Sequence, residues 1–318
     1  MNLRGILLPF TTPFKQNEDL DLESLRANIQ RWNQTGISGY VALGSTGERV
    51  NLDEREYLEV IETARSEVPA NLTFIVGAGQ QSTRQTVCEV KRAAAAGADA
   101  VLVITPGFYR AAITPDALVQ HYTTVAEASP VPVILYSMPD LTGVAIEPET
   151  VAQLSEHPNI VGIKDSSANM LHFKETMRLV DAEFAVLTGN GTVLYAALSA
   201  GARGAVLAVG CAAAEYCLEI HSQVVSGDNE TAAALQDKLT PLALAVTKRY
   251  GIGGLKAALD LTGLKGGAVR APLKSPGPDA RQEIAQLLEA VINDTASRNK
   301  SGDTSRTDLG GFAGALRT

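Results

Sequence analysis

Eight times the sequence alternates a short apolar run with a segment of helical pattern, and no other feature constrains its fold as much. Each run is rich in β-branched and other apolar residues and has the length of a strand. Strands buried on both faces that alternate with helices indicate a parallel sheet. Eight such units predict an α/β protein, a (β/α)8 TIM barrel. The runs lie at residues 5–8, 39–43, 73–76, 100–104, 131–136, 160–164, 185–188 and 204–208.

Helix start and stop signals flank the segments between the runs. Thr114 precedes Pro115, the usual order of an N-cap and a first helical residue. Glycines follow three of the segments, at Gly36, Gly97 and Gly201. The barrel helices are expected at residues 22–35, 53–67, 82–96, 115–128, 148–156, 169–180 and 192–200.

An open, doubly wound sheet is the alternative to a barrel. Dinucleotide-binding folds of that kind place a Gly-x-Gly-x-x-Gly turn after the first strand. Here the first run is followed by residues 9–13, which read Pro-Phe-Thr-Thr-Pro. Partial matches at residues 77–79 and 189–191 are better interpreted as ordinary turn glycines, so the barrel is favoured.

The alternation stops near residue 223, and from there the pattern is helical. We expect a catalytic barrel at residues 1–224 and a C-terminal helical domain at residues 225–294. Residues 295–318 are rich in Ser, Gly, Asp, Arg and Thr and have almost no apolar periodicity, which predicts a mobile tail. The C-terminal helices are expected at residues 228–249, 253–261 and 278–292.

Charge and cysteine usage exclude several classes of partner. The net charge is −8 and no basic cluster occurs, which argues against nucleic acid and anionic membrane surfaces as partners. Three cysteines without metal-ligand spacing fit free thiols in a reducing compartment. The apolar run at residues 5–10 is too short for a secretory signal, and no stretch approaches the roughly 20 apolar residues of a membrane helix. We therefore expect a soluble, cytoplasmic protein.

Two reactive side chains end neighbouring runs, Tyr136 the fifth and Lys164 the sixth. The C-terminal ends of barrel strands carry the chemistry of TIM-barrel enzymes. A strand-end lysine often just reaches solvent, but apolar walls disfavour its charged form and free an amine for attack on a carbonyl. A tyrosine there is usually a packing residue, but a phenol that faces an amine can shuttle a proton.

A hydroxyl-rich turn follows the second run, where Gly44 and Gly47 flank Ser45 and Thr46. Such a turn exposes N–H groups and two short donors, which suits a carboxylate. A plain capping turn is the alternative.

Further residues are expected on the same rim. Gly189 and Asn190 follow the seventh run, where backbone can approach a ligand closely, and Val206 lies in the eighth. The four histidines are scattered over helical segments, and no phosphate loop is present, so we expect no metal and no cofactor. An amine, a phenol and a carboxylate turn together predict Schiff-base chemistry on a 2-oxo acid.

At these residues the sequence resembles the dihydrodipicolinate synthase and N-acetylneuraminate lyase family of class I, pyruvate-handling aldolases. The resemblance covers residues 4–292 and rests on the motifs at residues 44–48, 136–139 and 162–166. It implies a barrel with C-terminal helices, usually assembled as a homotetramer. The roles it implies are Schiff-base formation for Lys164, proton shuttling for Tyr136, carboxylate binding for Thr46 with Ser45, and a contact to the pyruvyl part for Val206.

Within the family the likeness is greatest to 4-hydroxy-2-oxoglutarate aldolase. This resemblance implies a lyase that splits 4-hydroxy-2-oxoglutarate into pyruvate and glyoxylate. The distal carboxylate would meet Ser166, Asn190 or Arg110. The similar segments are residues 109–110, 121–123, 129–137, 245–251 and 270–273.

Two positions depart from the family pattern. Synthases that condense aspartate semialdehyde carry an arginine where this chain has Leu141, so a bidentate hold on that substrate's carboxylate is missing. The relay tyrosine that a neighbouring subunit lends aligns with Phe108, which has no hydroxyl. Adjacent Tyr109 is the candidate to replace it.

The alternatives share the lysine and differ in the aldehyde. One is 4-hydroxy-tetrahydrodipicolinate synthase, which condenses pyruvate with aspartate semialdehyde; Leu141 makes us rank it lower. Others are lyases of N-acetylneuraminate or of 2-keto-3-deoxy sugar acids. A non-catalytic barrel that only binds oxo acids is a remote alternative, because such a protein has no use for a phenol that faces the amine.

Overall fold

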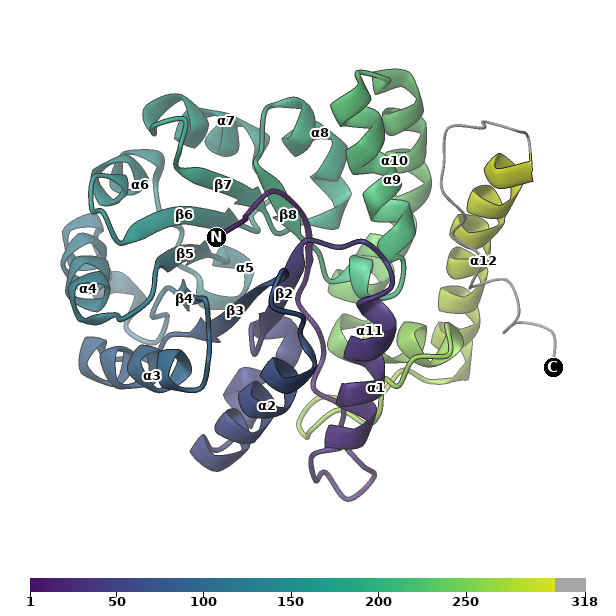
Figure 1. The fold of residues 1–318 in the computed structure, drawn as a ribbon, viewed down its shortest axis with the longest axis horizontal. Coiled ribbons are helices and arrows are strands. Elements are labelled where there is room, and N and C mark those ends of the chain that lie inside the picture. The colour runs from purple at the N-terminus through teal and green to yellow at the C-terminus, as the bar shows by residue number, and fades with distance from the viewer. Residues whose placement is uncertain (301–318) are drawn as a thin grey trace.

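Eight parallel strands close into a barrel in the computed structural model, which describes residues 1–300 and the side chains of residues 1–294. Each strand pairs with the next along the chain, and the last pairs with the first, so the predicted TIM barrel is confirmed (Figure 1). The strands are β1 (Gly5–Leu8), β2 (Gly39–Ala42), β3 (Thr73–Ala78), β4 (Ala100–Ile104), β5 (Val133–Ser137), β6 (Ile160–Asp165), β7 (Ala185–Thr188) and β8 (Gly204–Val206).

Both faces of the strands are buried, which explains why they read as continuous apolar runs. One set of side chains fills the barrel interior, including Leu7, Val41 and Ile134. The alternate set, including Ile6 and Leu8, packs outward in a larger cluster with the surrounding helices. Alternation along each strand therefore decides which residues can reach the barrel mouth from inside.

The surrounding helices begin where the capping residues predict. Asp53 caps its helix with a capping box, in which its carboxylate accepts the Glu56 N–H and the Glu56 side chain accepts the Asp53 N–H. Thr114 caps another, with Pro115 first. The three glycines expected after helices have positive φ angles. The barrel helices are α1 (Leu22–Trp32), α2 (Glu54–Glu67), α3 (Thr83–Ala95), α4 (Pro115–Ala128), the short α5 (Pro139–Thr142), α6 (Pro148–Ser155), α7 (Met170–Leu179), α8 (Leu194–Ser199) and α9 (Ala214–Ser226).

The structure differs clearly from the prediction at two places. Helix α9 (Ala214–Ser226) was not among the expected helices, because no polar side chain caps it and marks its start. Helix α12 (Pro278–Lys300) continues past the expected end at residue 292. No glycine or proline interrupts the sequence between Pro278 and Gly302. Residues 295–300 are therefore helical instead of part of a tail, and residues 301–318 lie outside the described part.

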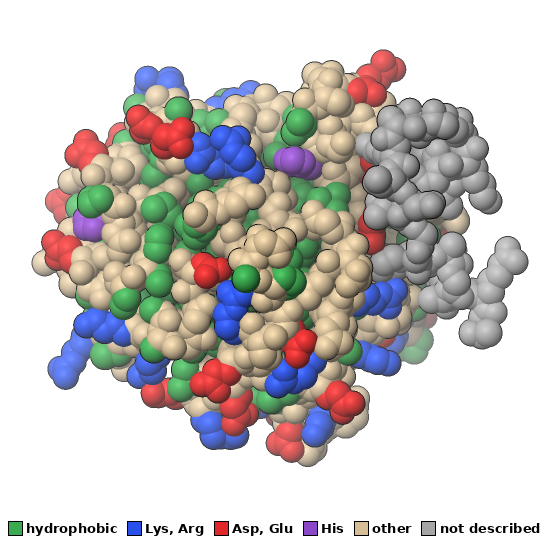
Figure 2. All heavy atoms as spheres, viewed as in Figure 1, with side chains coloured by type: hydrophobic (Ala, Val, Ile, Leu, Met, Phe, Trp, Pro, Cys, Tyr) green, Lys and Arg blue, Asp and Glu red, His purple; other side chains and the backbone are tan. Residues whose placement is uncertain are grey.

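The C-terminal helices α10 (Asn229–Leu244), η6 (Ala245–Arg249), α11 (Gly251–Leu261) and α12 lie at one side of the barrel (Figure 1). Helix α10 packs against α9, and α12 packs against α10 and α11. The division at residues 224 and 225 stays a prediction. Figure 2 shows acidic and basic side chains interspersed over the described part of one face. Within that part of the chain, no helix has the length and apolar character required to cross a membrane.

Candidate active site

Lys164 and Tyr136 lie side by side at the mouth of the barrel. They are partners in the parallel register of β5 and β6, so their side chains point to the same face. Tyr136 belongs to the interior cluster, and Leu187, the partner of Lys164 in β7, does too. The Lys164 Nζ lies 4.4 Å from the centroid of the Tyr136 ring, and both residues are only 3% exposed. The structure thus brings the predicted amine and phenol together.

The hydroxyl turn reaches the same point from β2. Ser45 and Thr46 lie in a single 3-10 turn, η1 (Ser45–Gly47), and the Ser45 Oγ is 3.1 Å from the Tyr136 hydroxyl, where either can donate. The Thr12 hydroxyl donates to the Gly47 carbonyl at 2.7 Å and holds the far end of the turn. The Ser45 hydroxyl and the Tyr136 phenol therefore form one polar pair, and the Tyr136 ring lies beside the amine.

Left-handed backbone flanks this turn on both sides. Leu43 has φ 54° before it, and Glu48 has φ 54° after it. Residues other than glycine rarely take this conformation, and such strain is typical of functional sites. The turn is therefore held in place by its surroundings and not by local preference alone.

Gly189 is required by the lysine side chain itself. A Cβ atom at this position would lie 2.6 Å from the Lys164 Cε and 1.9 Å from the Ser166 Oγ. Ser166 is buried, and its hydroxyl has no hydrogen-bond partner within residues 1–294. A buried hydroxyl without a partner is free to meet a bound substrate.

The other rim residues have different surroundings. Val206 is buried in the interior cluster with Tyr136, and its contact to the pyruvyl part stays a prediction. The Asn190 Oδ1 accepts bonds from the Thr192 N–H at 3.0 Å and from its hydroxyl at 2.8 Å. The Asn190 Oδ1 is thus hydrogen-bonded within its own turn, and the side-chain amide nitrogen is the atom that can donate to a ligand.

Tyr109 and Arg110 are not buried with the central pair. Tyr109 is 71% exposed, and its ring packs edge-on against Phe108, which is 75% exposed. The Arg110 side chain lies over Gly143, where a Cβ atom would come within 2.5 Å of its Cδ. Arg110 also lines a separate cavity of about 220 Å³ that contains neither Lys164 nor Tyr136. A relay or distal-contact role for these two residues stays a prediction.

A cluster of three titratable side chains, His172, Asp165 and Glu147, includes the residue next to the lysine in the chain and was not predicted from the sequence. The His172 Nδ1 lies 3.6 Å from the Asp165 carboxylate, and its Nε2 lies 3.5 Å from the Glu147 carboxylate. The interaction with Asp165, opposed by partial burial and reinforced by Glu147, raises the pKa of His172 above its ordinary value. Asp165 also accepts the Ser167 N–H at 2.7 Å, so the segment after Lys164 is fixed. Asp165 directly follows the lysine, but His172 comes from helix α7 and Glu147 from the start of α6, and no motif in the sequence relates the three.

Another titratable group, the buried thiol of Cys211, interacts electrostatically with Lys164. Burial raises the pKa of Cys211, and the thiol donates to the Pro9 carbonyl at 3.4 Å. Within residues 1–294, no group of three or more His, Cys, Asp or Glu side chains is arranged to hold a metal ion.

Curated relatives match nearly the whole chain. The protein from Nitrobacter hamburgensis named 4-hydroxy-tetrahydrodipicolinate synthase is 36% identical over 285 residues, which cover 90% of this chain and 95% of that one. The protein of the same name from Gluconobacter oxydans is 33% identical, with 91% and 96% covered.

Solved structures agree with these relatives. The dihydrodipicolinate synthase of Thermotoga maritima superposes with a TM-score of 0.85 at 31% identity, covering 93% of this chain and 99% of that one. The Acinetobacter baumannii enzyme, solved in complex with pyruvate, gives a TM-score of 0.86 at 28% identity, covering 92% and 99%. The family model described as the dihydrodipicolinate synthetase family matches residues 2–291. This chain therefore belongs to the dihydrodipicolinate synthetase family, and it is a class I, pyruvate-dependent carbon–carbon lyase.

Proposed function

We propose that the Lys164 Nζ forms a Schiff base with the C2 ketone of pyruvate and that the chain joins this unit to an aldehyde. The observation that carries the proposal is the buried, register-paired Lys164 and Tyr136 at the barrel mouth. A neutral amine beside a proton-transferring phenol is what carbonyl addition requires. Ser45 and Thr46 are the proposed holders of the pyruvyl carboxylate.

The proposed steps balance without any further reactant. Lys164 adds to the ketone, and loss of one water leaves an iminium. Tyr136 passes on the proton that leaves the C3 methyl group, which gives an enamine. The enamine carbon attacks the aldehyde, and the aldehyde oxygen takes up a proton through Tyr136 to become a hydroxyl. Water then hydrolyses the iminium and frees both product and amine; cleavage follows the same steps in reverse.

The first candidate for the aldehyde is aspartate semialdehyde. The relatives described above carry the name 4-hydroxy-tetrahydrodipicolinate synthase, at up to 36% identity over nearly the whole chain. They favour this alternative over the expected 4-hydroxy-2-oxoglutarate aldolase, whose support came from short segments. We therefore propose that the chain condenses pyruvate with aspartate semialdehyde.

Leu141 favours a second candidate. This side chain is 62% exposed at the position where the synthase pattern has an arginine. Without a guanidinium there, the carboxylate of aspartate semialdehyde lacks a bidentate partner. Glyoxylate, which with pyruvate gives 4-hydroxy-2-oxoglutarate, carries its carboxylate directly on the aldehyde carbon. That carboxylate would therefore lie nearer the amine, where Ser166, Asn190 or Arg110 are the proposed partners in place of an arginine at position 141.

Borohydride reduction in the presence of pyruvate tests the common chemistry. We expect a mass gain of one reduced pyruvyl group, located on Lys164 by peptide mapping. The control Lys164→Arg should show no gain. No gain in the unaltered protein, or a label on another residue, would overturn the proposal.

An aldehyde panel then separates the candidates. The protein is incubated with pyruvate and, in turn, with aspartate semialdehyde, glyoxylate and N-acetylmannosamine, and the products are read by mass spectrometry. Highest turnover with aspartate semialdehyde supports the first candidate, and highest turnover with glyoxylate supports the second. If no aldehyde reacts, transfer of deuterium from solvent into the pyruvate methyl group distinguishes an untested aldehyde from a barrel that only binds oxo acids.

We also propose a cytoplasmic location. The chain has three free cysteines and a net charge of −8, which suit a reducing compartment without a charged surface as partner. Fractionation of the native cells, followed with an antibody against this chain, checks it.

A further inference from the structure

The turn that carries Ser45 and Thr46 is closed by a buried glutamate. Glu48 takes the left-handed conformation, and its N–H donates to the Ser45 carbonyl at 3.2 Å. The Asn51 N–H donates in turn to the Glu48 carbonyl at 2.8 Å. Glu48 is only 2% exposed, so its carboxylate must find partners inside the protein.

The main partner comes from the C-terminal helices. The Lys256 Nζ, on α11, lies 2.6 Å from the Glu48 Oε1, with side chains that are 2% and 1% exposed. The same ammonium donates to the Ala268 carbonyl at 2.5 Å and lies 4.5 Å from the centroid of the Phe14 ring. Burial lowers the pKa of Lys256, and the nearby Glu48 carboxylate opposes that change.

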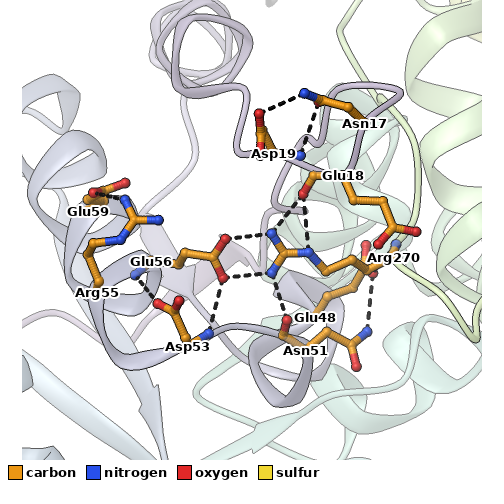
Figure 3. A network of polar contacts seen from close by, with 10 residues as sticks. All are labelled: Asn17, Glu18, Asp19, Glu48, Asn51, Asp53, Arg55, Glu56, Glu59 and Arg270. Atoms are coloured by element: carbon orange, nitrogen blue, oxygen red, sulfur yellow. Dashed lines mark hydrogen bonds and ion pairs between the residues drawn. The ribbon is translucent and has the colours of Figure 1, made fainter.

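The second oxygen of the Glu48 carboxylate accepts hydrogen bonds from the C-terminal segment and from the turn itself. The Glu48 Oε2 accepts the backbone N–H of Arg270 at 3.1 Å and the side-chain amide of Asn51 at 3.4 Å. The Arg270 guanidinium has other partners: Figure 3 shows it bound to the Glu56 carboxylate and to the carbonyls of Asn51 and Glu18. Segments far apart in the sequence thus meet on one side of the turn.

A buried ion pair is weak evidence for stability, because desolvation of two charges offsets most of their attraction. The pair does fix geometry, because either charge would be left uncompensated in the interior if it moved away from its partner. Here the fixed element is the turn that sets the Ser45 Oγ 3.1 Å from the Tyr136 hydroxyl. The C-terminal helices are therefore physically connected to the active site.

We propose that Glu48 and Lys256 are positioning residues, which hold the Ser45–Thr46 turn at the place where it receives the pyruvyl carboxylate and contacts Tyr136. This inference rests on the proposed Schiff-base function of Lys164. Neither residue touches the reacting atoms; both act through the turn.

The test compares Lys256→Met with the double variant Glu48→Gln, Lys256→Met in the full chain. The readout is the pyruvate concentration that gives half-maximal borohydride trapping on Lys164, measured well below each melting temperature. Lys256→Met leaves a buried carboxylate unpaired and should lower the melting temperature. The double variant has no unpaired charge and should regain most of that stability.

The positioning role predicts that the double variant does not regain pyruvate binding. Both variants should need at least about tenfold more pyruvate for half-maximal trapping, because a misplaced turn costs binding even in a stable fold. The control Lys238→Met, which breaks the ion pair between Lys238 and Asp294 among the same C-terminal helices, should match the unaltered protein.

The outcomes are separable. If the double variant, or a folded Lys256→Met, traps pyruvate at the concentrations of the unaltered protein, the pair has only a structural role and the inference is wrong. If Lys256→Met does not fold, the double variant decides the question alone. If the unaltered protein itself is not trapped, the proposed function fails, and the positioning role falls with it.

Discussion

At the scale of the residue, the Lys164 amine depends on empty space at Gly189. A Gly189→Ala variant would place a methyl group 1.9 Å from the Ser166 Oγ and 2.6 Å from the Lys164 Cε, closer than real Cβ atoms approach, so both side chains must move. We expect the rate of borohydride trapping with pyruvate to fall on the order of 100-fold, because the amine leaves its attack geometry. Gly277→Ala is the control, since a Cβ atom there meets nothing within 4 Å. Equal trapping rates in the two variants would contradict this account.

Tyr136→Phe removes the hydroxyl that Ser45 contacts while keeping the ring against Lys164. Turnover should fall by roughly 10²–10⁴ because a proton shuttle is lost. The pyruvate adduct should still form, more slowly, and remain detectable by mass after borohydride reduction. Tyr122→Phe is a matched control, because it removes a buried hydroxyl that bonds the Val103 carbonyl instead. Full activity of Tyr136→Phe would refute the shuttle.

At the scale of the element, the contact between α3 and α4 contains a buried histidine. His121 is 6% exposed, and its Nδ1 lies 2.9 Å from the Thr83 hydroxyl. Burial lowers the pKa of His121 to about 4, from an ordinary value of 6.5. The unfolded chain therefore binds more protons in this range, and stability is lost as the pH falls through it.

His121→Phe should remove that pH sensitivity. Between pH 7 and pH 5 the histidine accounts for a loss of about 2 kcal/mol in the free energy of unfolding, which the variant should not show. Urea unfolding at both pH values, followed by circular dichroism, measures the difference. Thr83→Val keeps the imidazole and should lose stability on acidification as the unaltered protein does. An unchanged pH dependence in His121→Phe would place the acid sensitivity elsewhere.

Elements were predictable from the sequence to the extent that local patterns fix them. The eight strands and the capped helices were found because apolar runs, Asp53, Thr114 and the glycines at helix ends act within a few residues. Helix α9 was missed because it has no polar cap. Lys164 and Tyr136 were identified because the end of a barrel strand is a defined position, and parallel register then brings neighbours together.

At the scale of the whole molecule, contacts between distant segments escaped prediction. Nothing local in the sequence relates Glu48 to Lys256, since only the folded chain brings α11 against the turn after β2. The order of the candidate aldehydes changed for a related reason. The sequence analysis ranked them by the single position Leu141, whereas the relatives that match nearly the whole chain favour aspartate semialdehyde.

The exposed aromatic patch, defined as Phe108, Tyr109 and Leu141, makes a prediction about assembly. The three side chains are 75%, 71% and 62% exposed on the loop after β4 and on helix α5, where Gly107 packs against the Thr142 backbone. Exposed apolar groups that cluster in this way are typical of interaction surfaces. The family resemblance implies a homotetramer, in which a neighbouring subunit lends an aromatic residue from the Phe108 position. We therefore expect the chain to self-associate through the aromatic patch.

The double variant Phe108→Ser, Tyr109→Ser should shift the protein toward smaller species in sedimentation equilibrium, because it replaces the two large rings of the patch by small polar groups. Its melting temperature should fall only in proportion to the lost association, since neither ring belongs to the barrel core. Leu171→Ser is the control: this leucine is 83% exposed on α7, outside the patch, and its loss should leave the mass distribution unchanged. A monomeric unaltered protein, or a double variant of unchanged mass, would show that the patch does not join subunits.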